Sequence, residues 1–347
     1  MPSLEDHCRS IAATISDYRA GELPAPDLGH VLRWVEQFDA PDRQVVAAEI
    51  DRALGKTYYN RTSIAAILSG IISYEPFVGN DPRTFWSNAS LLEIQGVSES
   101  QHHFVSLISE GINQKYGINV VSNAPNAENW IYIDDGIFSG NQAIGDIQRW
   151  LDEHNPSGGT LNIIVIVAHT YGDYRFKQAI KPLLTARGMR LQVWRIKNLE
   201  NRFTYRDQSD LLWPTQIYDG ERMHYWQGLT DNDLRNFTPR SAGTVGGEEL
   251  FSSVQAKLQV EEAFTRKGAE ICTYSANNHE LMKPLGYSPF KSYGFGTIFA
   301  TYKNCPNNAP LVLWWGDPEG SPTLRRWYPL MQRRVRRQLQ EFDECDF

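Results

Sequence analysis

Residues 130–142 carry the pattern that decides the fold, and they read Trp-Ile-Tyr-Ile-Asp-Asp-Gly-Ile-Phe-Ser-Gly-Asn-Gln. The apolar residues 130–133 predict a buried strand, two acids follow, and a short turn at Ser139 and Gly140 leads into an amphipathic helix. The expected apolar face of this helix consists of Ala143, Ile147, Trp150 and Leu151. A helix that begins directly after such a turn presents its first N–H groups and the positive end of its dipole together, where they can hold a phosphate.

The two acids and the turn are expected to act as one site. Asp134 and Asp135 stand where the two hydroxyls of a ribose would need acceptors, and a carboxylate pair could also anchor Mg²⁺ carried by a pyrophosphate. The expected contacts to phosphate and ribose are Gly136, Ile137, Phe138, Ser139, Gly140, Asn141 and Gln142. The alternative is a plain strand-to-helix turn with solvated acids.

The segments around this stretch predict a parallel sheet. We expect strands at 91–95, 130–133, 163–168 and 191–196, with helices around 104–112, 143–151 and 176–186. The continuous aliphatic run at 163–168 is typical of a parallel strand covered on both faces. Alternation of strand and helix with short joints predicts a right-handed βαβ sheet, whose ligands bind at the carboxyl ends of the strands.

The fold class is therefore α/β, with a parallel-sheet core at 89–200 between a helical region at 1–88 and an α+β region at 201–347. The helical spacing of Val31, Trp34, Val35 and Phe38 supports the first region. Residues 75–88, rich in Pro, Gly and Asn, are expected to form the connection into the core. In the last region we expect a helix at 249–267, a strand pair at 294–302 and 311–315, and a basic helix at 327–342.

Composition limits the classes of function. The chain has 347 residues, of which 41% are hydrophobic, enough for a sizeable core. Its formal charge of -7 argues against nonspecific binding of nucleic acid by the whole surface. The cysteines at 8, 272, 305 and 345 are scattered and predict neither a disulfide framework nor a zinc site. The acidic N-terminal segment lacks an apolar run, so a cytoplasmic protein without signal peptide or membrane anchor is expected.

The stretch 130–142 resembles the phosphoribosyl pyrophosphate-binding motif of type I phosphoribosyltransferases. The match covers the apolar strand, both acids, Ile137, Ser139 and Gly140, whereas Gly136, Phe138 and Gln142 depart from the usual residues. The resemblance implies a phosphoribosyltransferase-like core that binds phosphoribosyl pyrophosphate or a nucleotide with Mg²⁺. In an enzyme of this kind, Asp134 and Asp135 would be the catalytic candidates.

The segment before this motif lies where such enzymes place their pyrophosphate loop. The residues concerned are Gly96, Val97, Ser98, Ser100 and Gln101. The spacing of Ser98 and Gln101 equally fits a helix capping box. Glu99 would repel an anion, and the loop has no Lys or Arg. Residues 163–176, including His169, resemble the next strand and loop of the same fold.

The C-terminal part and the helical start around 31–38 resemble phosphoribosyltransferase-like proteins of bacterial conflict systems. This resemblance implies a role in antiphage defence with co-encoded partner proteins. Residues 325–337 contain six arginines beside the apolar residues Leu330, Met331 and Val335. A solvated or partner-binding helix is the default interpretation there, and a contact to nucleic acid is the alternative.

Other constellations fit less well. Residues 96–100 are similar to a hydrolase nucleophile elbow, with Ser98 as nucleophile and His169 as base, but Ser100 replaces the final glycine. A haloacid-dehalogenase phosphatase needs acids separated by one residue, and the pair here is adjacent. His102 and His103 would point in different directions on a helix and cannot share a metal. Two classes remain open, an enzyme of ribosyl chemistry and a catalytically degenerate sensing or interaction module.

Overall fold

The computed structural model describes residues 2–95, 100–216, 238–274, 281–290 and 292–333. The chain folds into two compact units, each described separately below. Unit 1 comprises residues 1–58, 211–245 and 250–347, and unit 2 comprises residues 59–210 and 246–249. Residues 59–88, expected in the N-terminal region, therefore belong with the sheet, while the N-terminal helices share a unit with most of the C-terminal region. None of the helices in the described segments is long and apolar enough to cross a membrane.

Unit 2 is built on a five-stranded parallel sheet with the order β3-β2-β4-β5-β6. The strands are β2 (Ala89–Leu91), β3 (Val121–Ser122), β4 (Asn129–Ile137), β5 (Thr160–His169) and β6 (Arg190–Leu199). The helices of this unit are α4 (Arg61–Ile71), α5 (Glu75–Val78), α6 (Pro82–Ser87), α7 (Ser100–Tyr116), α8 (Asn141–His154) and α9 (Thr170–Thr185), followed by the 3₁₀ helix η1 (Phe203–Gln208). The expected α/β fold with a parallel core is confirmed.

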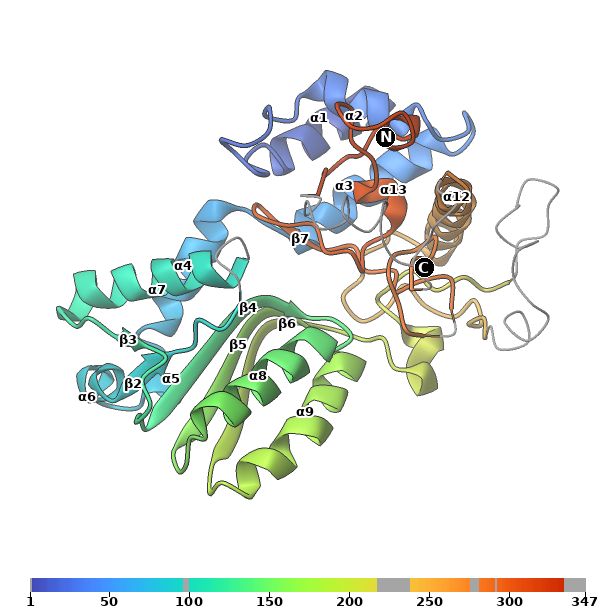
Figure 1. The fold of residues 1–347 in the computed structure, drawn as a ribbon. Helices are drawn as coiled ribbons and strands as arrows, with labels where there is room; N and C mark the ends of the chain where they lie inside the picture. Colours follow the sequence, from blue (N-terminus) through green and yellow to red (C-terminus); the bar gives the residue numbers. More distant parts are fainter. Residues whose placement is uncertain (1, 96–99, 217–237, 275–280, 291, 334–347) are drawn as a thin grey trace. The chain divides into compact units, whose positions relative to one another are not determined.

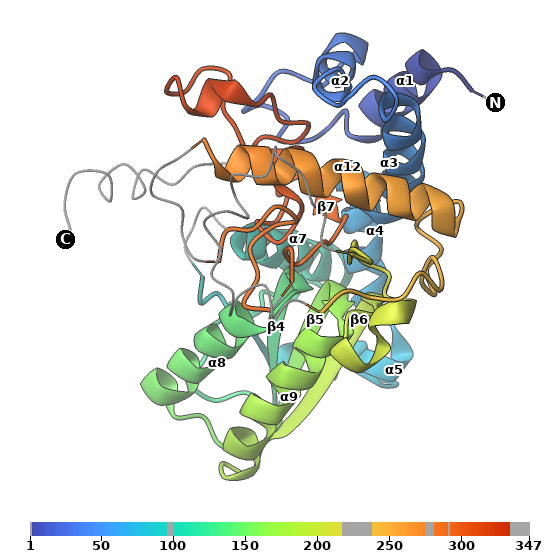
Figure 2. The same ribbon diagram turned by 90° about the vertical axis from the view of Figure 1, so that its right-hand side faces the viewer.

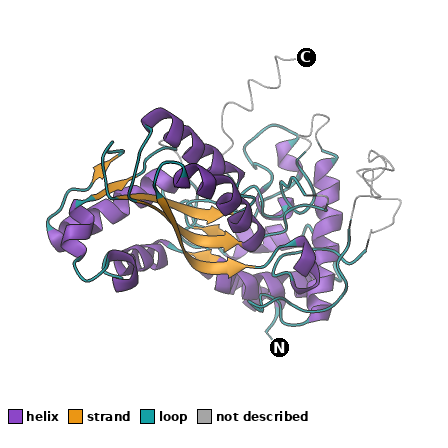
Figure 3. Ribbon diagram, turned by 90° about the horizontal axis from the view of Figure 1, so that it is seen from below, coloured by secondary structure: helices purple, strands orange, loops and turns teal. Residues whose placement is uncertain are grey.

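Helices cover both faces of this sheet (Figures 1 and 3). The chain moves from β2 to β3 in one direction along the sheet and from β4 through β5 to β6 in the other. Right-handed crossovers in opposite directions place their helices on opposite faces, so α7 lies on one face and α8 and α9 on the other. Figure 2 shows α8 and α9 in front of β4, β5 and β6.

The core under α8 and α9 explains why the strands and helices of this segment could be predicted from the sequence. Trp130, Tyr132, Leu161, Ile163 and Val165 alternate along β4 and β5, and they pack against Ala143, Ile147, Trp150 and Leu151 of α8 and Phe176, Ile180 and Leu184 of α9. All ten residues of β5 are buried, as expected for a central parallel strand. The register pairs Tyr132 with Ile163 and Asp134 with Val165.

Some elements of unit 2 differ in extent from the expectation. The expected strand at 91–95 is β2 at Ala89–Leu91, and β4 continues through both acids to Ile137. The expected connection at 75–88 contains the short helices α5 and α6. Each of these helices has a proline in its first turn, where the missing N–H has no intrahelical partner to lose, and Asp81 caps α6 by accepting from Thr84 N–H.

Unit 1 is mainly helical. Its elements are α1 (Leu4–Thr14), α2 (Leu28–Val35), α3 (Arg43–Thr57), α12 (Val254–Cys272), α13 (Leu311–Trp314) and η2 (Leu324–Arg326), and a second, two-stranded sheet contains β1 (Tyr58–Tyr59) and β7 (Ala300–Thr301). The expected helix at 249–267 begins later, at Val254, because the Ser253 hydroxyl caps it by accepting from Ala256 N–H. Arg240 and Glu261 form a fully buried ion pair with 2.7 Å between Nη2 and Oε2.

Two expectations for the C-terminal region are wrong. The strand pair at 294–302 and 311–315 is absent, because within these two described ranges only β7 lies in a sheet, and Leu311–Trp314 is helical. Gly294 and Gly296 have φ of 143° and 77°, which breaks an extended strand. The basic helix at 327–342 does not begin at Trp327, since residues 327–333 are irregular.

Backbone contacts explain why residues 327–333 are not a helix. Tyr328 N–H donates to Gln37 Oε1, and Met331 N–H donates to Leu313 O. Pro329 has no N–H to donate. Backbone N–H groups of this segment thus form hydrogen bonds with distant parts of unit 1 instead of with a helical turn. Residues 334–342 lie outside the described residues.

Candidate functional site

The carboxyl ends of β2 and β4 meet at the topological switch point of the sheet. β2 lies between β3 and β4, and the chain leaves β2 and β4 in opposite directions. Helices on opposite faces leave a crevice between the ends of two such strands, and α/β sheets bind ligands there. Asp134, Asp135 and the turn before α8 lie at this end of β4.

The turn from β4 into α8 consists of Phe138, Ser139 and Gly140. Gly140 is the N-cap residue, with φ of 86° in the left-handed region, and no side chain caps the helix. Ser139 Oγ lies 3.5 Å from Asn141 N, at the limit for a hydrogen bond. The first turn of α8 therefore presents backbone N–H groups that an anion could accept from.

This turn rests directly on the start of α9. A Cβ atom on Gly172 would lie 1.9 Å from Phe138 O, and one on Gly140 would lie 2.9 Å from Gly172 O. Because both positions are glycine, the backbone of the turn and the backbone of α9 can lie in direct contact. Gly140 was expected to serve close approach to a ligand, whereas the contribution of Gly172 was not foreseen. A glycine three residues after a strand was the only sequence signal.

Phe138 turns inward and accounts for one departure from the family pattern. A Cβ atom on Gly136 would lie 2.7 Å from Val167 Cγ1 and 3.1 Å from two ring atoms of Phe138, so Val167 and the ring together occupy the space that an aliphatic residue at 136 would need. The ring also packs against the His169 imidazole, with 5.0 Å between centroids. His169 is fully buried, and its Nδ1 lies 3.0 Å from Ile137 O. Burial lowers the pKa of His169 to about 3, so the ring is neutral and Nδ1 donates.

The two acids lie on different faces of the sheet, because consecutive residues of a strand alternate. Asp134 shares the α8 face with Tyr132, and Asp135 faces the other way. Their exposed fractions are only 6% and 5%. Asp134 Oδ1 accepts from Asp135 N–H at 2.8 Å, and Asp134 Oδ2 accepts from Tyr132 O–H at 3.0 Å. The carboxylate of Asp134 is thus held in a fixed orientation.

Gln95 joins this network from the end of the β2 segment. Its Nε2 lies 2.9 Å from Asp134 Oδ2 and 3.0 Å from Asp146 Oδ2. Arg149 donates to Asp146 Oδ1 at 2.8 Å. Burial, together with the Asp134 and Asp146 carboxylates, holds the pKa of Tyr132 well above its usual value, so the phenol stays protonated as a donor.

Sequence reasoning did not identify Gln95, Tyr132 and Asp146 as parts of the site. Asp146 did leave a signal, since it is an acid on the same helix face as the buried Ala143, Ile147 and Trp150. The hydrogen bonds of Gln95 to β4 and α8 leave no signal in the sequence, because they join segments that lie far apart in the chain.

The segment expected as a pyrophosphate loop is described only in part. Gly96, Val97 and Ser98 lie outside the described residues, and Ser100 is the first residue of α7. Gln101 is fully buried, and its Oε1 accepts from the N–H groups of Ile94 at 3.0 Å and Gln95 at 2.9 Å. Within the described residues, Gln101 therefore fixes the backbone that carries Gln95.

One cation reaches the turn before α8. Arg175 of α9 donates from Nη1 to Asn141 Oδ1 at 2.8 Å and to Ser139 O at 3.3 Å. Arg175 follows Gly172 by one helical turn, so both lie on the face of α9 that meets this turn. Among the described residues there is no group of three or more His, Cys, Asp or Glu side chains that could hold a metal. A cation at Asp134 or Asp135 would need further oxygen ligands, such as those of a phosphate.

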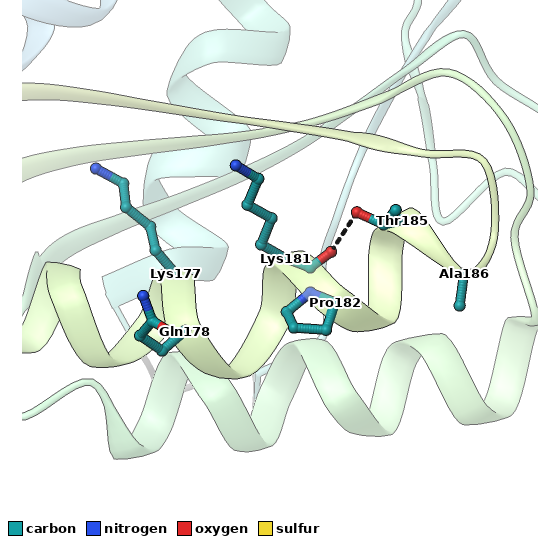
Figure 4. A pocket seen from close by; sticks show the side chains of 6 residues that line it. All are labelled: Lys177, Gln178, Lys181, Pro182, Thr185 and Ala186. Atoms are coloured by element: carbon teal, nitrogen blue, oxygen red, sulfur yellow. Dashed lines mark hydrogen bonds between the residues drawn. The ribbon is translucent and has the colours of Figure 1, made fainter.

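Two shallow surface depressions lie away from this site. One follows the outer side of α9 and is lined by Lys177, Gln178, Lys181, Pro182, Thr185 and Ala186 (Figure 4). Within it, Thr185 O–H donates to Lys181 O at 2.9 Å. The other adjoins residues 87–89 and 124–128, at the amino ends of β2 and β4. Neither is lined by Asp134, Asp135 or the residues of the turn before α8.

Comparison with known proteins agrees with this geometry. A search among curated proteins gives no match. The family model PRTase-CE matches residues 31–333, which include most of the chain and the entire parallel sheet. The chain therefore belongs to the PRTase-CE family and is a phosphoribosyltransferase-like protein.

Proposed function

We propose that the protein binds a phosphoribosyl ligand, phosphoribosyl pyrophosphate or a nucleotide, at the carboxyl end of β4. The 5-phosphate would lie against the backbone of residues 138–142, where the N–H groups of α8 and its dipole favour an anion. The observation that carries this proposal is the connection from β4 to α8. Two acids in the last part of the strand are followed, after residues 136–139, by the N-cap Gly140 at φ of 86° without a side-chain cap. Family membership supports the same ligand class.

Asp134 and Asp135 are proposed to accept from the ribose hydroxyls, with Asp134 reaching the ligand from the α8 face of β4 and Asp135 from the opposite face. The bonds from Tyr132 and Gln95 would hold Asp134 ready for this role, since a preoriented acceptor loses less freedom when the ligand binds. Ser139, Asn141 and Gln142 would add donors near the phosphate, and Gly136, Ile137 and Phe138 would shape the turn.

Mg²⁺ is proposed to enter with the ligand. In proteins, Mg²⁺ is commonly held by one or two carboxylates together with substrate phosphates, and Asp134 and Asp135 offer the carboxylates. When bound, it would neutralise the charge of a pyrophosphate group. The chain's own contribution would be to orient the ribose and to hold the 5-phosphate.

The biological setting that the resemblance implies is antiphage defence, with the protein as an effector or accessory component. Co-encoded proteins would be its partners, and nucleic acid could bind at the arginines of 325–337. Within the described part, Arg326 stacks on Tyr274 at 3.9 Å and Arg333 lies 5.2 Å from the Trp314 ring centroid. Residues 334–337 lie outside the described residues.

A second candidate is a catalytically degenerate module that has kept the phosphate site. Gln142 in place of the usual hydroxyl residue favours it, as does Glu99 in the first loop. Incubating the protein with phosphoribosyl pyrophosphate and Mg²⁺ and following ³¹P resonances separates the two. Pyrophosphate release would identify an enzyme, whereas binding without turnover across a panel of nucleobases would identify the module.

The ligand proposal is tested by calorimetry with ribose 5-phosphate, ribose and inorganic phosphate. Asp135→Asn, alone and with Asp134→Asn, should weaken ribose 5-phosphate binding by about tenfold or more, because each lost charged acceptor is worth about 1.5–3 kcal/mol. Inorganic phosphate binding should change far less. Asp152→Asn, the same charge change at an exposed position of α8, is the control. Equal losses for the two ligands would show that the acids are structural.

A further inference from the structure

The proposed phosphate position has an electrostatic problem that the turn cannot solve by itself. Residues 138–142 contain no Lys or Arg, and Asp134 and Asp135 precede them on the same strand, separated from them by Gly136 and Ile137. Both carboxylates are largely buried, where like charges repel more strongly than in water. A ligand phosphate, which carries up to two negative charges, therefore needs a cation from another element.

Most cations near this end of the sheet are already paired with acids. Arg149 pairs with Asp146 at 2.8 Å, and Lys177 pairs with Asp173 at 2.8 Å. Arg195 also lies 3.4 Å from Asp173. The charge of Arg149 is offset by Asp146, while Lys177 and Arg195 share the carboxylate of Asp173 and are held at that acid rather than at the turn.

Arg175 is different. Its Nη1 contacts two neutral oxygens, Ser139 O and Asn141 Oδ1, and within the described residues it takes part in no ion pair. A partly buried guanidinium that contacts only neutral acceptors keeps its charge for another anion. It contacts the residues on either side of the Gly140 N-cap, next to the uncapped N-terminus of α8.

The contact of α9 with the turn fixes this position. Gly172 lies against Phe138 O so closely that no side chain fits, and Arg175 follows on the same helix face. The guanidinium therefore reaches the turn from a rigid helix packed on it. Its planar fork suits recognition of a phosphate while Nη1 holds the turn.

We propose that Arg175 is the positioning and charge-supplying residue of the phosphate site, orienting the turn at 138–142 and offsetting the charge of the ligand's 5-phosphate. This inference rests on the proposed function and adds a residue that lies outside the motif at 130–142. It also predicts selectivity, since the affinity for a ligand without a phosphate should not depend on Arg175.

The experiment measures ribose 5-phosphate binding to the full chain by calorimetry over a series of salt concentrations. Arg175→Gln should weaken binding by about tenfold or more and flatten its salt dependence, because screening acts on the lost charge. Arg175→Lys should keep the salt dependence and recover part of the affinity, since the charge returns without the fork. Lys181→Gln, the same charge change farther along α9, should match the wild type.

The outcomes separate this inference from the proposed function. Wild-type protein that binds ribose 5-phosphate, with Arg175→Gln unchanged in affinity and salt dependence, would overturn the role of Arg175 and leave the site intact. Wild-type protein that binds no ribose 5-phosphate would overturn both. If Arg175→Gln lowers the melting temperature, the test uses the folded Arg175→Lys variant instead. Reduced affinity for ribose 5-phosphate in that variant, with the same salt dependence as Lys181→Gln, would support the inference.

Discussion

Two strand-to-helix joints lie next to each other at the carboxyl ends of β4 and β5, and only the first has the features from which we propose an anion site. Between β4 and α8 the chain makes a turn of three residues that ends at Gly140 in the left-handed region. Between β5 and α9 there is no turn, because α9 begins directly after the buried N-cap residue His169. Neither helix has a side-chain bond from its N-cap residue.

The difference lies in what occupies the two helix N-termini. At α9, Tyr171 N–H donates to Asn201 Oδ1 at 2.9 Å, and the acid Asp173 lies in the first turn. At α8, the first turn has no acid, and Arg175 brings a positive charge. If α8 binds a phosphate as we propose, a helix dipole would create an anion site where backbone N–H groups remain available and the local charge is favourable.

The largest expected effect comes from the contact that sets α9 against the turn. Gly172→Ala places a Cβ where Phe138 O now lies, and a backbone atom cannot move aside without displacing the turn. We expect a loss of about 3 kcal/mol in the free energy of unfolding, the upper part of the range for overpacking, and loss of ribose 5-phosphate binding. Urea unfolding and calorimetry measure the two effects.

Gly145→Ala is the matched control for this change. Gly145 lies within α8, and a Cβ there would meet nothing within 4 Å. Alanine in a helix interior should stabilise the protein by about 0.5–1 kcal/mol and leave binding unchanged. If Gly172→Ala behaved like Gly145→Ala, the turn would not depend on its contact with α9.

A second prediction concerns His169, which closes the other joint. Burial lowers its pKa from 6.5 to about 3, so below pH 6.5 the unfolded chain takes up a proton that the folded chain does not. The free energy of unfolding should therefore be highest above pH 6.5 and should fall as the pH decreases. At about pH 5 the loss should be about 2 kcal/mol, since each pKa unit is worth about 1.4 kcal/mol. Unfolding titrations across this range measure the slope.

Replacing the imidazole distinguishes His169 from the other acids and bases of the protein. His169→Phe keeps a ring against Phe138 but cannot take up a proton, so its stability should depend less on pH between 6.5 and 5. His154→Gln, an exposed position at the end of α8, should keep the wild-type slope. An unchanged slope in His169→Phe would assign the pH dependence to other groups.

The two joints also show how far the sequence could be read. The aliphatic run of β5 and the apolar face of α8 are local patterns with a fixed period, and both were predicted correctly. The position of the acids and the turn toward the carboxyl end of a parallel strand followed from the alternation of strands and helices, whereas the strand order that makes this end a switch point was not predicted. The extension of β4 through the acids was missed, because polar residues at a strand end resemble a turn.

What could not be predicted depends on contacts between distant segments. Gln95 bonds to Asp146 across 51 positions, and Arg175 reaches Asn141 across 34. No local period encodes such pairs. The apolar run of α13 was taken for a strand because a short apolar run fits either structure, and Pro310 at its N-cap favoured the helix only in the folded context.

The smallest expected effect comes from opening the second joint. Asn201→Ala removes the acceptor of Tyr171 N–H, and we expect a loss of about 1 kcal/mol, the net value of one hydrogen bond. The variant should not gain affinity for inorganic phosphate, because Asp173 would still keep a carboxylate in the first turn of α9 and hold Lys177 and Arg195 in ion pairs. Asn201→Ala combined with Asp173→Asn removes both obstacles. This double variant should show weak phosphate binding by calorimetry in the presence of saturating ribose 5-phosphate, which fills the site at the start of α8.

Phosphate binding by Asn201→Ala alone would mean that free N–H groups suffice and that the charge of the first turn matters little. No binding by the double variant would mean that the left-handed glycine turn, which only the β4–α8 joint has, is required as well.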